Sequence, residues 1–237
     1  MPEGQVIVTG ASRGIGAACV TELAERGFDV VGFSRTGGSP AGRGISCDVG
    51  DEAALMAAIA DVAAVGPIRG LVNNAGLHNG AVPSHELSVE DYEFIQHTNA
   101  TSAMVACREA YPHLVANGGG MIINMGSLFD KVGVPANLAY SVSKAALGVL
   151  TRVLAVEWAR QEITVLNVAP GYIETNLAPD FWADERSQKW IRRRVPVGRH
   201  GTSEEVGRLV ASLFQEKIHF MTGETIYIDG GHGINHG

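Results

Sequence analysis

A tyrosine and a lysine four positions apart could carry acid–base chemistry in this chain. These are Tyr140 and Lys144, and Ser127 lies upstream of them. Residues four apart on a helix lie one turn above each other on the same face, so a helix would hold the lysine ammonium near the phenol. A nearby cation lowers a tyrosine pKa from its usual value of about 10. Such a phenol could exchange a proton with a carbonyl or alcohol oxygen near neutral pH; the alternative is an exposed helical pair.

The residues around this pair predict the elements that would position it. Residues 139–160 are rich in Ala, Leu and Val and contain a single glycine, Gly148, which favours a long helix. Residues 121–125 form an apolar run typical of a buried strand, and Ser127 follows its carboxyl end. We therefore expect the serine to lie at the edge of a sheet, where a helix could bring Tyr140 beside it.

A glycine-rich segment near the amino terminus indicates phosphate binding. The apolar strand predicted at 5–9 runs into Gly10, Gly14 and Gly16, and an amphipathic helix follows. Glycines let a backbone approach a pyrophosphate, and a helix amino terminus presents free N–H groups and a partial positive charge. The spacing G-x-x-x-G-x-G differs from the common dinucleotide fingerprint, so a tight turn without a ligand is the alternative.

The segment after the second predicted strand, 28–34, favours NADP over NAD. NAD-binding chains usually place an acidic residue about 20 positions after the glycines. Here no Asp or Glu occurs between Asp29 and Asp48. Arg35 and Arg13 could instead hold a 2′-phosphate through charge-assisted hydrogen bonds, although each arginine alone could be a solvated surface charge.

Strands and helices alternate along the chain, which predicts parallel pairing in one α/β domain covering residues 1–237. Ligands of such sheets lie beyond the carboxyl ends of the strands, where Asn73-Asn74-Ala75-Gly76 and Pro170-Gly171 fall. Residues 36–44 are predicted as a loop. The segment 176–199 is predicted as a lid over the substrate, and its arginines at 192–194 could meet an anionic substrate or form a solvated face. Further strands are expected at 45–47, 69–72, 164–168 and 224–228, and further helices at 52–65, from Ser88, and at 202–214.

Composition excludes several classes of protein. The chain has 237 residues, of which 46% are hydrophobic and 18% charged, as expected of a folded domain. A net charge of −7 argues against general nucleic-acid binding. Three cysteines are too few for a disulfide framework or a zinc site, and the histidines, His78 and His232 among them, lack metal-ligand spacing. We expect no membrane span, signal peptide or metal, and a cytoplasmic location.

Taken together, the motifs resemble the single-domain branch of the short-chain dehydrogenase/reductase family. They occur in the family's order and with family-like spacings, from residue 5 to the final strand. The matching residues are Thr9-Gly10-Ala11-Ser12-Arg13-Gly14-Ile15-Gly16, Asn73-Asn74-Ala75-Gly76, Asn99, Ser127, Tyr140 with Lys144, and Pro170-Gly171.

The resemblance implies a Rossmann-type, seven-stranded parallel sheet with helices on both faces, a nicotinamide cofactor, and a homotetramer or homodimer. It also implies roles for four residues. Tyr140 would be the catalytic acid and base, and Ser127 would hydrogen-bond the substrate oxygen. Lys144 would hold the nicotinamide ribose and lower the pKa of Tyr140, while Asn99 would support a water-mediated proton relay.

For the cofactor, the resemblance implies a site distributed over the whole sheet edge. Ser12, Arg13 and Ile15 would meet the pyrophosphate, Asp48 and Val49 the adenine, Asn74 and Gly76 the ribose, and Ile173 and Thr175 the carboxamide. The full predicted cofactor site is Gly10, Ser12, Arg13, Gly14, Ile15, Gly16, Ser34, Arg35, Asp48, Val49, Asn74, Ala75, Gly76, Tyr140, Lys144, Pro170, Gly171, Ile173 and Thr175.

Within the family, the sequence looks most like 3-oxoacyl-(acyl-carrier-protein) reductases. That group tends to carry basic residues just before the serine-bearing strand, and this chain has Asn117-Gly118-Gly119-Gly120 there. The sequence therefore indicates a free small ketone or alcohol as much as it indicates a carrier-bound acyl chain. The predicted function is NADP(H)-dependent interconversion of a ketone and a secondary alcohol. The alternatives are an NAD-dependent dehydrogenase of a diol or cyclic alcohol, and a cofactor-binding sensor without catalysis.

Overall fold

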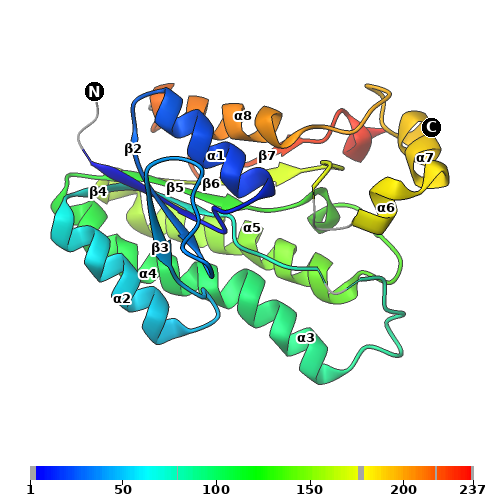
Figure 1. The fold of residues 1–237 in the computed structure, drawn as a ribbon, viewed down its shortest axis with the longest axis horizontal. Helices are drawn as coiled ribbons and strands as arrows, with labels where there is room; N and C mark the ends of the chain where they lie inside the picture. The colour runs from blue at the N-terminus through cyan, green and yellow to red at the C-terminus, as the bar shows by residue number, and fades with distance from the viewer. Residues whose placement is uncertain (1–3, 79, 176–178, 217, 236–237) are drawn as a thin grey trace.

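A computed structural model describes residues 4–78, 80–175, 179–216 and 218–235. Seven parallel strands form one sheet in the order β3-β2-β1-β4-β5-β6-β7 (Figure 1). The order reverses between β1 and β4, which is the switch point where ligands of such sheets bind. The predicted Rossmann-type fold is confirmed. The strands are β1 (Gln5–Thr9), β2 (Asp29–Ser34), β3 (Arg43–Ser46), β4 (Ile68–Asn73), β5 (Gly120–Met125), β6 (Ile163–Pro170) and β7 (Thr225–Ile228).

Helices cover both faces of this sheet (Figure 1). α1 and α8 pack together on one face, and α2, α4 and α5 lie on the other. The α-helices are α1 (Gly14–Glu25), α2 (Glu52–Val65), α3 (Val89–Gln96), α4 (Ser102–Ala116), α5 (Leu138–Trp158), α6 (Pro179–Ala183), α7 (Glu185–Arg194) and α8 (Ser203–Glu216).

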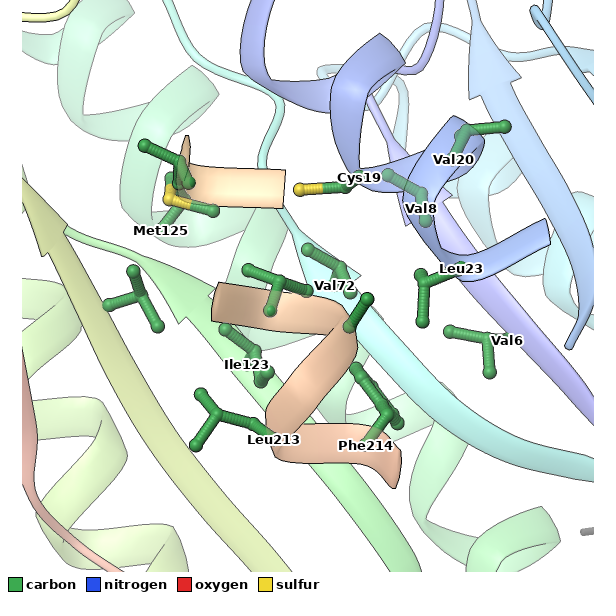
Figure 2. Close-up of a cluster of buried hydrophobic side chains, with 14 of the residues drawn as sticks. Val6, Val8, Cys19, Val20, Leu23, Val72, Ile123, Met125, Leu213 and Phe214 are labelled. Atoms are coloured by element: carbon green, nitrogen blue, oxygen red, sulfur yellow. The ribbon is translucent and has the colours of Figure 1, made fainter. Parts of the chain in front are cut away.

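Strand alternation explains the two cores. Side chains of successive strand residues point to opposite faces, and a parallel sheet buries both. Along β1, Val6 and Val8 join the core under α1 and α8, while Ile7 joins the core under α2 and α4. Figure 2 shows the first core, where Leu23 of α1 and Phe214 of α8 lie over the strand residues.

Most predicted elements are present, and their ends differ from the prediction by at most two residues. α2 spans the predicted 52–65, and the Ser88 hydroxyl caps α3 by accepting a hydrogen bond from Asp91 N (3.0 Å). As predicted, residues 36–42 contain no helix. The helix expected from Ser88 onward is not continuous, because a π-helical turn, His97–Thr101, separates α3 from α4.

One expectation about the longest helix needs correction. The stretch Leu138–Gln161 is long and apolar enough to cross a membrane by length and composition, although no such run was expected. The stretch consists of α5 and the 3-10 turn that follows it, and α5 packs against β5 and β6. A helix of a folded domain that packs one face against a sheet, as α5 does, passes the same test.

Candidate active site

A cavity of about 860 Å³ opens at the carboxyl ends of the strands, around the switch point between β1 and β4. All nineteen residues predicted to bind the cofactor line it, from Gly10 to Thr175, and so does Ser127. These residues come from nearly every strand end, and the fold therefore brings the predicted site together in one place. Of the predicted residues, Asn99 lies outside the cavity lining, buried behind it.

The glycine turn at one end of this cavity has room for backbone alone. Gly10 (φ +69°) and Gly14 (φ +55°) adopt left-handed conformations that side chains disfavour. A Cβ on Gly16 would come within 2.2 Å of the Gly10 carbonyl oxygen, and one on Gly10 within 2.9 Å of Ala75 Cα. No side chain caps α1, and no acidic residue lies in its first turn. This open helix amino terminus beside a close-packed glycine turn fits the pyrophosphate of a dinucleotide.

Hydrogen bonds across the switch point hold the floor of the cavity. The Thr9 hydroxyl accepts hydrogen bonds from the backbone N–H groups of Asn74 and Ala75, both at 3.0 Å. The Asn74 amide donates to Thr9 O at 2.9 Å and to Gly10 O at 3.3 Å. The end of β1 is thus fastened to the segment that follows β4, which fixes the backbone that a cofactor would contact.

Two arginines lie at the end of the cavity formed by β2. Arg13 and Arg35 are exposed and line the cavity, and β2 ends at Ser34, whose hydroxyl donates to Gly38 O (2.9 Å). The two acidic lining residues are engaged in capping: Asp48 accepts a hydrogen bond from Gly50 N and Asp51 accepts one from Ala54 N, both at 3.0 Å. This donor set fits a phosphate on the adenosine ribose.

The cavity also has lining residues that the sequence did not single out. Phe94 and His97 come from α3 and the π-helical turn, and the His97 Nε2 atom lies 2.8 Å from Gly50 O. The π-helical turn brings both residues to the cavity, and no periodicity in the sequence predicts this turn. The other unpredicted lining residues are Phe33, Thr36, Cys47, Gly50, Asp51, Leu77, His78, Thr98, Met125 and Gly126.

At the other end of the cavity, Ser127, Tyr140 and Lys144 meet as predicted. Ser127 follows β5, and Tyr140 and Lys144 lie one turn apart near the start of α5. Ser127 lies close enough to the Tyr140 phenol to lower its pKa. The Lys144 ammonium donates to Met125 O at 2.8 Å and lies 5.6 Å from the centre of the Tyr140 ring.

The acidity of Tyr140 differs from the expectation. Burial raises the pKa of Tyr140 to about 12, and the hydrogen bond from Ser127 offsets this only in part. Burial also lowers the pKa of Lys144 to about 8, since its side chain is only 4% exposed. Removal from water disfavours both charged forms and is the largest cause of both shifts. The phenol is therefore protonated near neutral pH and suited to donate a proton.

Buried hydrogen bonds fasten α5 to the sheet. Asn73 and Asn124 lie in register on β4 and β5, and the Asn73 amide donates to Asn124 Oδ1 (2.9 Å). The Asn124 amide in turn donates to the Thr151 hydroxyl on α5 (2.9 Å). All three residues are buried, where an unmade hydrogen bond would be costly. The network sets the position of the helix that carries Tyr140 and Lys144.

Asn99 connects the cavity wall to the same helix. It sits in the π-helical turn, a distortion frequent at functional sites. Its side chain accepts from Leu77 N and donates to Leu77 O, both at 2.9 Å, and donates to the Ser143 hydroxyl at 3.0 Å. A Cβ on Gly76 would lie 3.2 Å from Asn99 Oδ1 and 3.5 Å from Lys144 Nζ, so both side chains lie close to the Gly76 backbone.

Aromatic rings frame Tyr140 on its open side. The His78 ring lies edge-on at 5.0 Å and the Phe129 ring at 5.7 Å, between ring centres. His78 also contacts the Asn137 side chain through its Nε2 atom. The sequence placed His78 on a loop or at the surface, and the structure places it in a loop that lines the cavity. Its position directly after Asn73-Asn74-Ala75-Gly76 and Leu77 was the available signal.

Among the residues that the structure describes, no three His, Cys, Asp or Glu side chains lie close enough to hold a metal ion. Cys19, Cys47 and Cys107 are buried free thiols, and burial raises the pKa of each.

Known proteins share this arrangement. The sequence pattern of the family described as Enoyl-(Acyl carrier protein) reductase matches residues 10–233. A tropinone reductase homologue of Arabidopsis thaliana is 37% identical over 244 residues, which cover 97% of this chain and 90% of that protein. The 3-oxoacyl-[acyl-carrier-protein] reductase MabA of Mycobacterium tuberculosis is 35% identical over 233 residues, 98% of this chain and 93% of that protein. The structure of a gluconate 5-dehydrogenase from Burkholderia cenocepacia, in complex with NADP and tartrate, superposes with a TM-score of 0.93 at 29% identity, covering 99% of this chain and 97% of that one.

The fold, the site and these relatives define a nicotinamide-dependent oxidoreductase. The chain belongs to the short-chain dehydrogenase/reductase family.

Proposed function

We propose that this protein is an NADP(H)-dependent oxidoreductase that interconverts a ketone and a secondary alcohol, with Tyr140 as proton donor and acceptor. The observation that carries the proposal is that Ser127, Tyr140 and buried Lys144 line the same cavity as the glycine turn. Nothing in the fold itself requires this combination. A sensor without catalysis would not need it.

The residues divide the chemistry among them. The bound nicotinamide would supply or accept the hydride. Ser127 would orient the substrate oxygen, and Tyr140, protonated at neutral pH, would donate the proton that completes an alcohol. Lys144 has a pKa of about 8 and thus stays mostly protonated at pH 7, where it would stabilise a transient phenolate. Asn99 would hold Leu77 and α5 in place and support the relay of the proton to solvent.

NADP is the proposed cofactor because two exposed arginines, Arg13 and Arg35, line the end of the cavity formed by β2. The Burkholderia cenocepacia relative was solved with NADP, which supports the same choice. An NAD-dependent dehydrogenase of a diol or cyclic alcohol is the alternative. The names of the relatives span acyl, sugar-acid and other carbonyl compounds, so they do not choose the substrate.

Replacing Tyr140 by phenylalanine tests the catalytic role. Tyr140→Phe removes the hydroxyl and keeps the ring, so turnover of ketones should fall about 10²–10⁴-fold, the range for loss of a general acid. NADPH affinity, measured by fluorescence titration, should change little. Tyr111→Phe is the matched control, because Tyr111 packs against Trp158 away from the cavity. Full activity in the Tyr140 variant would refute the proposal.

We also propose that the protein is a homotetramer or homodimer. Apolar side chains on α4 and α5 are exposed, including Val149, Val153 and Val156, and an apolar groove of about 240 Å³ lies between the two helices. Exposed apolar patches of this kind mark association surfaces. Light scattering should give a mass of two or four chains for the native protein and a smaller mass for Val153→Asp with Val156→Asp. A native monomer would contradict this assembly.

A further inference from the structure

The loop that follows β4 is joined to the segment just before the helix that carries Tyr140. Val82 N donates a hydrogen bond to Ala136 O at 2.9 Å. His78, which lines the cavity, is hydrogen-bonded through its Nε2 atom to Asn137 Oδ1. Because α5 begins at the next residue, both contacts lie directly before the first turn, in which Tyr140 is found.

The hydrogen bonds around His78 determine where its proton lies. Gly80 N donates to His78 Nδ1 at 3.1 Å, so Nδ1 accepts and carries no proton. The Asn137 amide nitrogen donates to Pro135 O at 2.8 Å, so the Asn137 oxygen faces the ring and accepts from Nε2–H. The imidazole is uncharged in this arrangement, and both of its nitrogens are engaged. His78 therefore holds Asn137 and has no ring nitrogen left to exchange a proton with a substrate.

Asn137 precedes α5 and does not cap it. Asn is among the preferred residues at a helix amino terminus, where its oxygen accepts from a backbone N–H of the first turn. The Asn137 side chain makes no such bond, and its oxygen is directed to His78 instead. The preceding residue, Ala136, has a left-handed φ of +61°, which is unfavourable for a residue with a Cβ. The first turn of α5 therefore depends on support from outside the helix.

That support comes from two neighbouring segments. The Gln96 amide, at the end of α3, donates to Ala139 O at 2.7 Å. His78 acts on the same turn twice, because it bonds Asn137 and its ring also meets the Tyr140 ring edge-on, with 5.0 Å between ring centres. We call the hydrogen-bonded pair of His78 and Asn137 the brace. Through the brace, a residue of the cavity lining reaches the turn that carries the phenol.

We propose that His78 is a positioning residue for the reaction: by bonding Asn137 and contacting the Tyr140 ring, it fixes the first turn of α5 and the direction of the Tyr140 hydroxyl. This inference rests on the proposed proton transfer by Tyr140. Loss of the brace should slow the chemical step and leave cofactor binding unchanged, because a small misplacement of a reacting group is enough to reduce a rate strongly.

Single and double variants test the brace by steady-state kinetics with NADPH and either ethyl acetoacetate or cyclohexanone. His78→Ala and Asn137→Ala should each lower kcat about tenfold, and the double variant should also lower it about tenfold, because all three remove the same contact. Asn137 is not part of the cavity lining, so its effect cannot come from a lost contact with the substrate. His78→Gln, whose amide can donate to Asn137 Oδ1, should stay within about threefold of the wild-type kcat.

Two readouts distinguish positioning from a general loss of structure. The solvent deuterium isotope effect on kcat should increase in His78→Ala and Asn137→Ala, since a misplaced phenol makes proton transfer slower. KM and NADPH affinity should change less than about twofold, because the brace acts on the chemical step. His85→Ala is the matched control and should leave kcat unchanged. His85 lies on the same loop, and its side chain is 83% exposed beside Glu86.

Hydrogen exchange tests the brace without turnover. Ser141 N donates to Asn137 O at 2.9 Å, so the first protected amide of α5 lies beside the brace. Amides of residues 141–144 should exchange about fivefold faster in His78→Ala and Asn137→Ala than in the wild type, because losing one hydrogen bond shifts local opening by about this factor. The His85→Ala protein should exchange like the wild type. Unchanged exchange in both brace variants would overturn the inference.

The outcomes separate failure of the brace from failure of the proposed function. An active wild type whose kcat is unchanged in Asn137→Ala would reject the inference and keep the function. A double variant about a hundredfold slower than the wild type would do the same, because independent effects multiply. A wild-type protein that reduces no ketone would reject the proposed function and the catalytic part of the inference with it, even where exchange shows that the brace exists.

Discussion

The two ends of the cavity differ in whether backbone or side-chain atoms form them. The cofactor end is built from backbone: Gly10 and Gly16 pack against main-chain atoms, and Thr9 ties two strand ends together through backbone N–H groups. The catalytic end is built from side chains: Ser127 follows β5, and Tyr140 and Lys144 lie on α5. Ring contacts continue from Tyr140 through Phe129 to Tyr172, and from there to rings of α6, α7 and the carboxyl-terminal turn. A backbone site tolerates almost no substitution, whereas rings on separate segments can be exchanged singly. Substitutions can thus change the ligand of the catalytic end while the structure of the cofactor end stays the same.

The largest effect on stability is expected from adding one methyl group at the cofactor end. Gly16→Ala would place a Cβ 2.2 Å from the Gly10 carbonyl oxygen, and the clash is with backbone. We expect a loss of about 3 kcal/mol in the free energy of unfolding and a large loss of NADPH affinity, since overpacking forces the backbone to shift. Urea denaturation and NADPH titration measure both.

Gly133→Ala is the control for that experiment, because a Cβ there would meet no atom within 4 Å. It should leave both quantities unchanged. An unaffected Gly16→Ala protein would show that the turn is less rigid than its packing implies.

Lys144 lies between the two ends of the cavity. Replacing it should raise the free energy of unfolding, whereas Gly16→Ala should lower it. Its pKa is lowered to about 8, so at pH 7 the folded protein holds a charge that burial disfavours. Lys144→Met should raise the free energy of unfolding at pH 7 by about 1–3 kcal/mol while abolishing activity, because it removes this cost along with one hydrogen bond.

The stability gained in Lys144→Met should depend on pH, because the pKa of Lys144 differs between the folded and unfolded states. Below pH 8 the lysine is charged in both folded and unfolded states, and the cost of burial is present in full. As pH rises from 8 to the unfolded value of about 10.4, the folded lysine is already neutral, and the cost disappears. The stability difference between variant and wild type should therefore shrink over this range in parallel urea titrations. Lys189→Met, at an exposed position, should show no such trend.

Replacing Arg35 should give the smallest change in stability. It tests whether the cofactor end distinguishes NADPH from NADH. Its side chain is exposed, so Arg35→Ala should alter the free energy of unfolding by less than about 0.5 kcal/mol. NADPH affinity should fall about tenfold or more and NADH affinity should hardly change, because charge-assisted hydrogen bonds to a phosphate would be lost.

Arg160→Ala, which removes an exposed arginine beyond α5, should change neither affinity. A wild-type preference for NADH over NADPH would overturn the assignment of the cofactor.

The difference between the ends also explains what could be predicted from sequence. The glycine turn and the Tyr140–Lys144 pair follow from local spacing, and the structure brings their residues to one cavity. The seven-stranded parallel sheet followed from the resemblance, and the order of its strands was not predicted. Phe129, Trp190 and His232 carry no local pattern, because their meeting depends on where three distant segments cross. Residues 176–178 of the predicted lid lie outside the described residues.

The raised pKa of Tyr140 was missed for a related physical reason. Helical spacing shows that a cation stands nearby, which predicts a lower pKa. It does not show how far the fold shields Tyr140 and Lys144 from water, and desolvation is the larger effect here. The π-helical turn that holds Asn99 was likewise hidden, because its sequence looks like ordinary helix.

The edge-on contacts of His78 and Phe129 with Tyr140 have a consequence for the handedness of the product. Flanked by two rings, the phenol can meet the carbonyl oxygen of a substrate from one direction only, while the prochiral carbon accepts the hydride. A flat ketone would then always turn the same face toward the nicotinamide, and the alcohol formed should be a single stereoisomer.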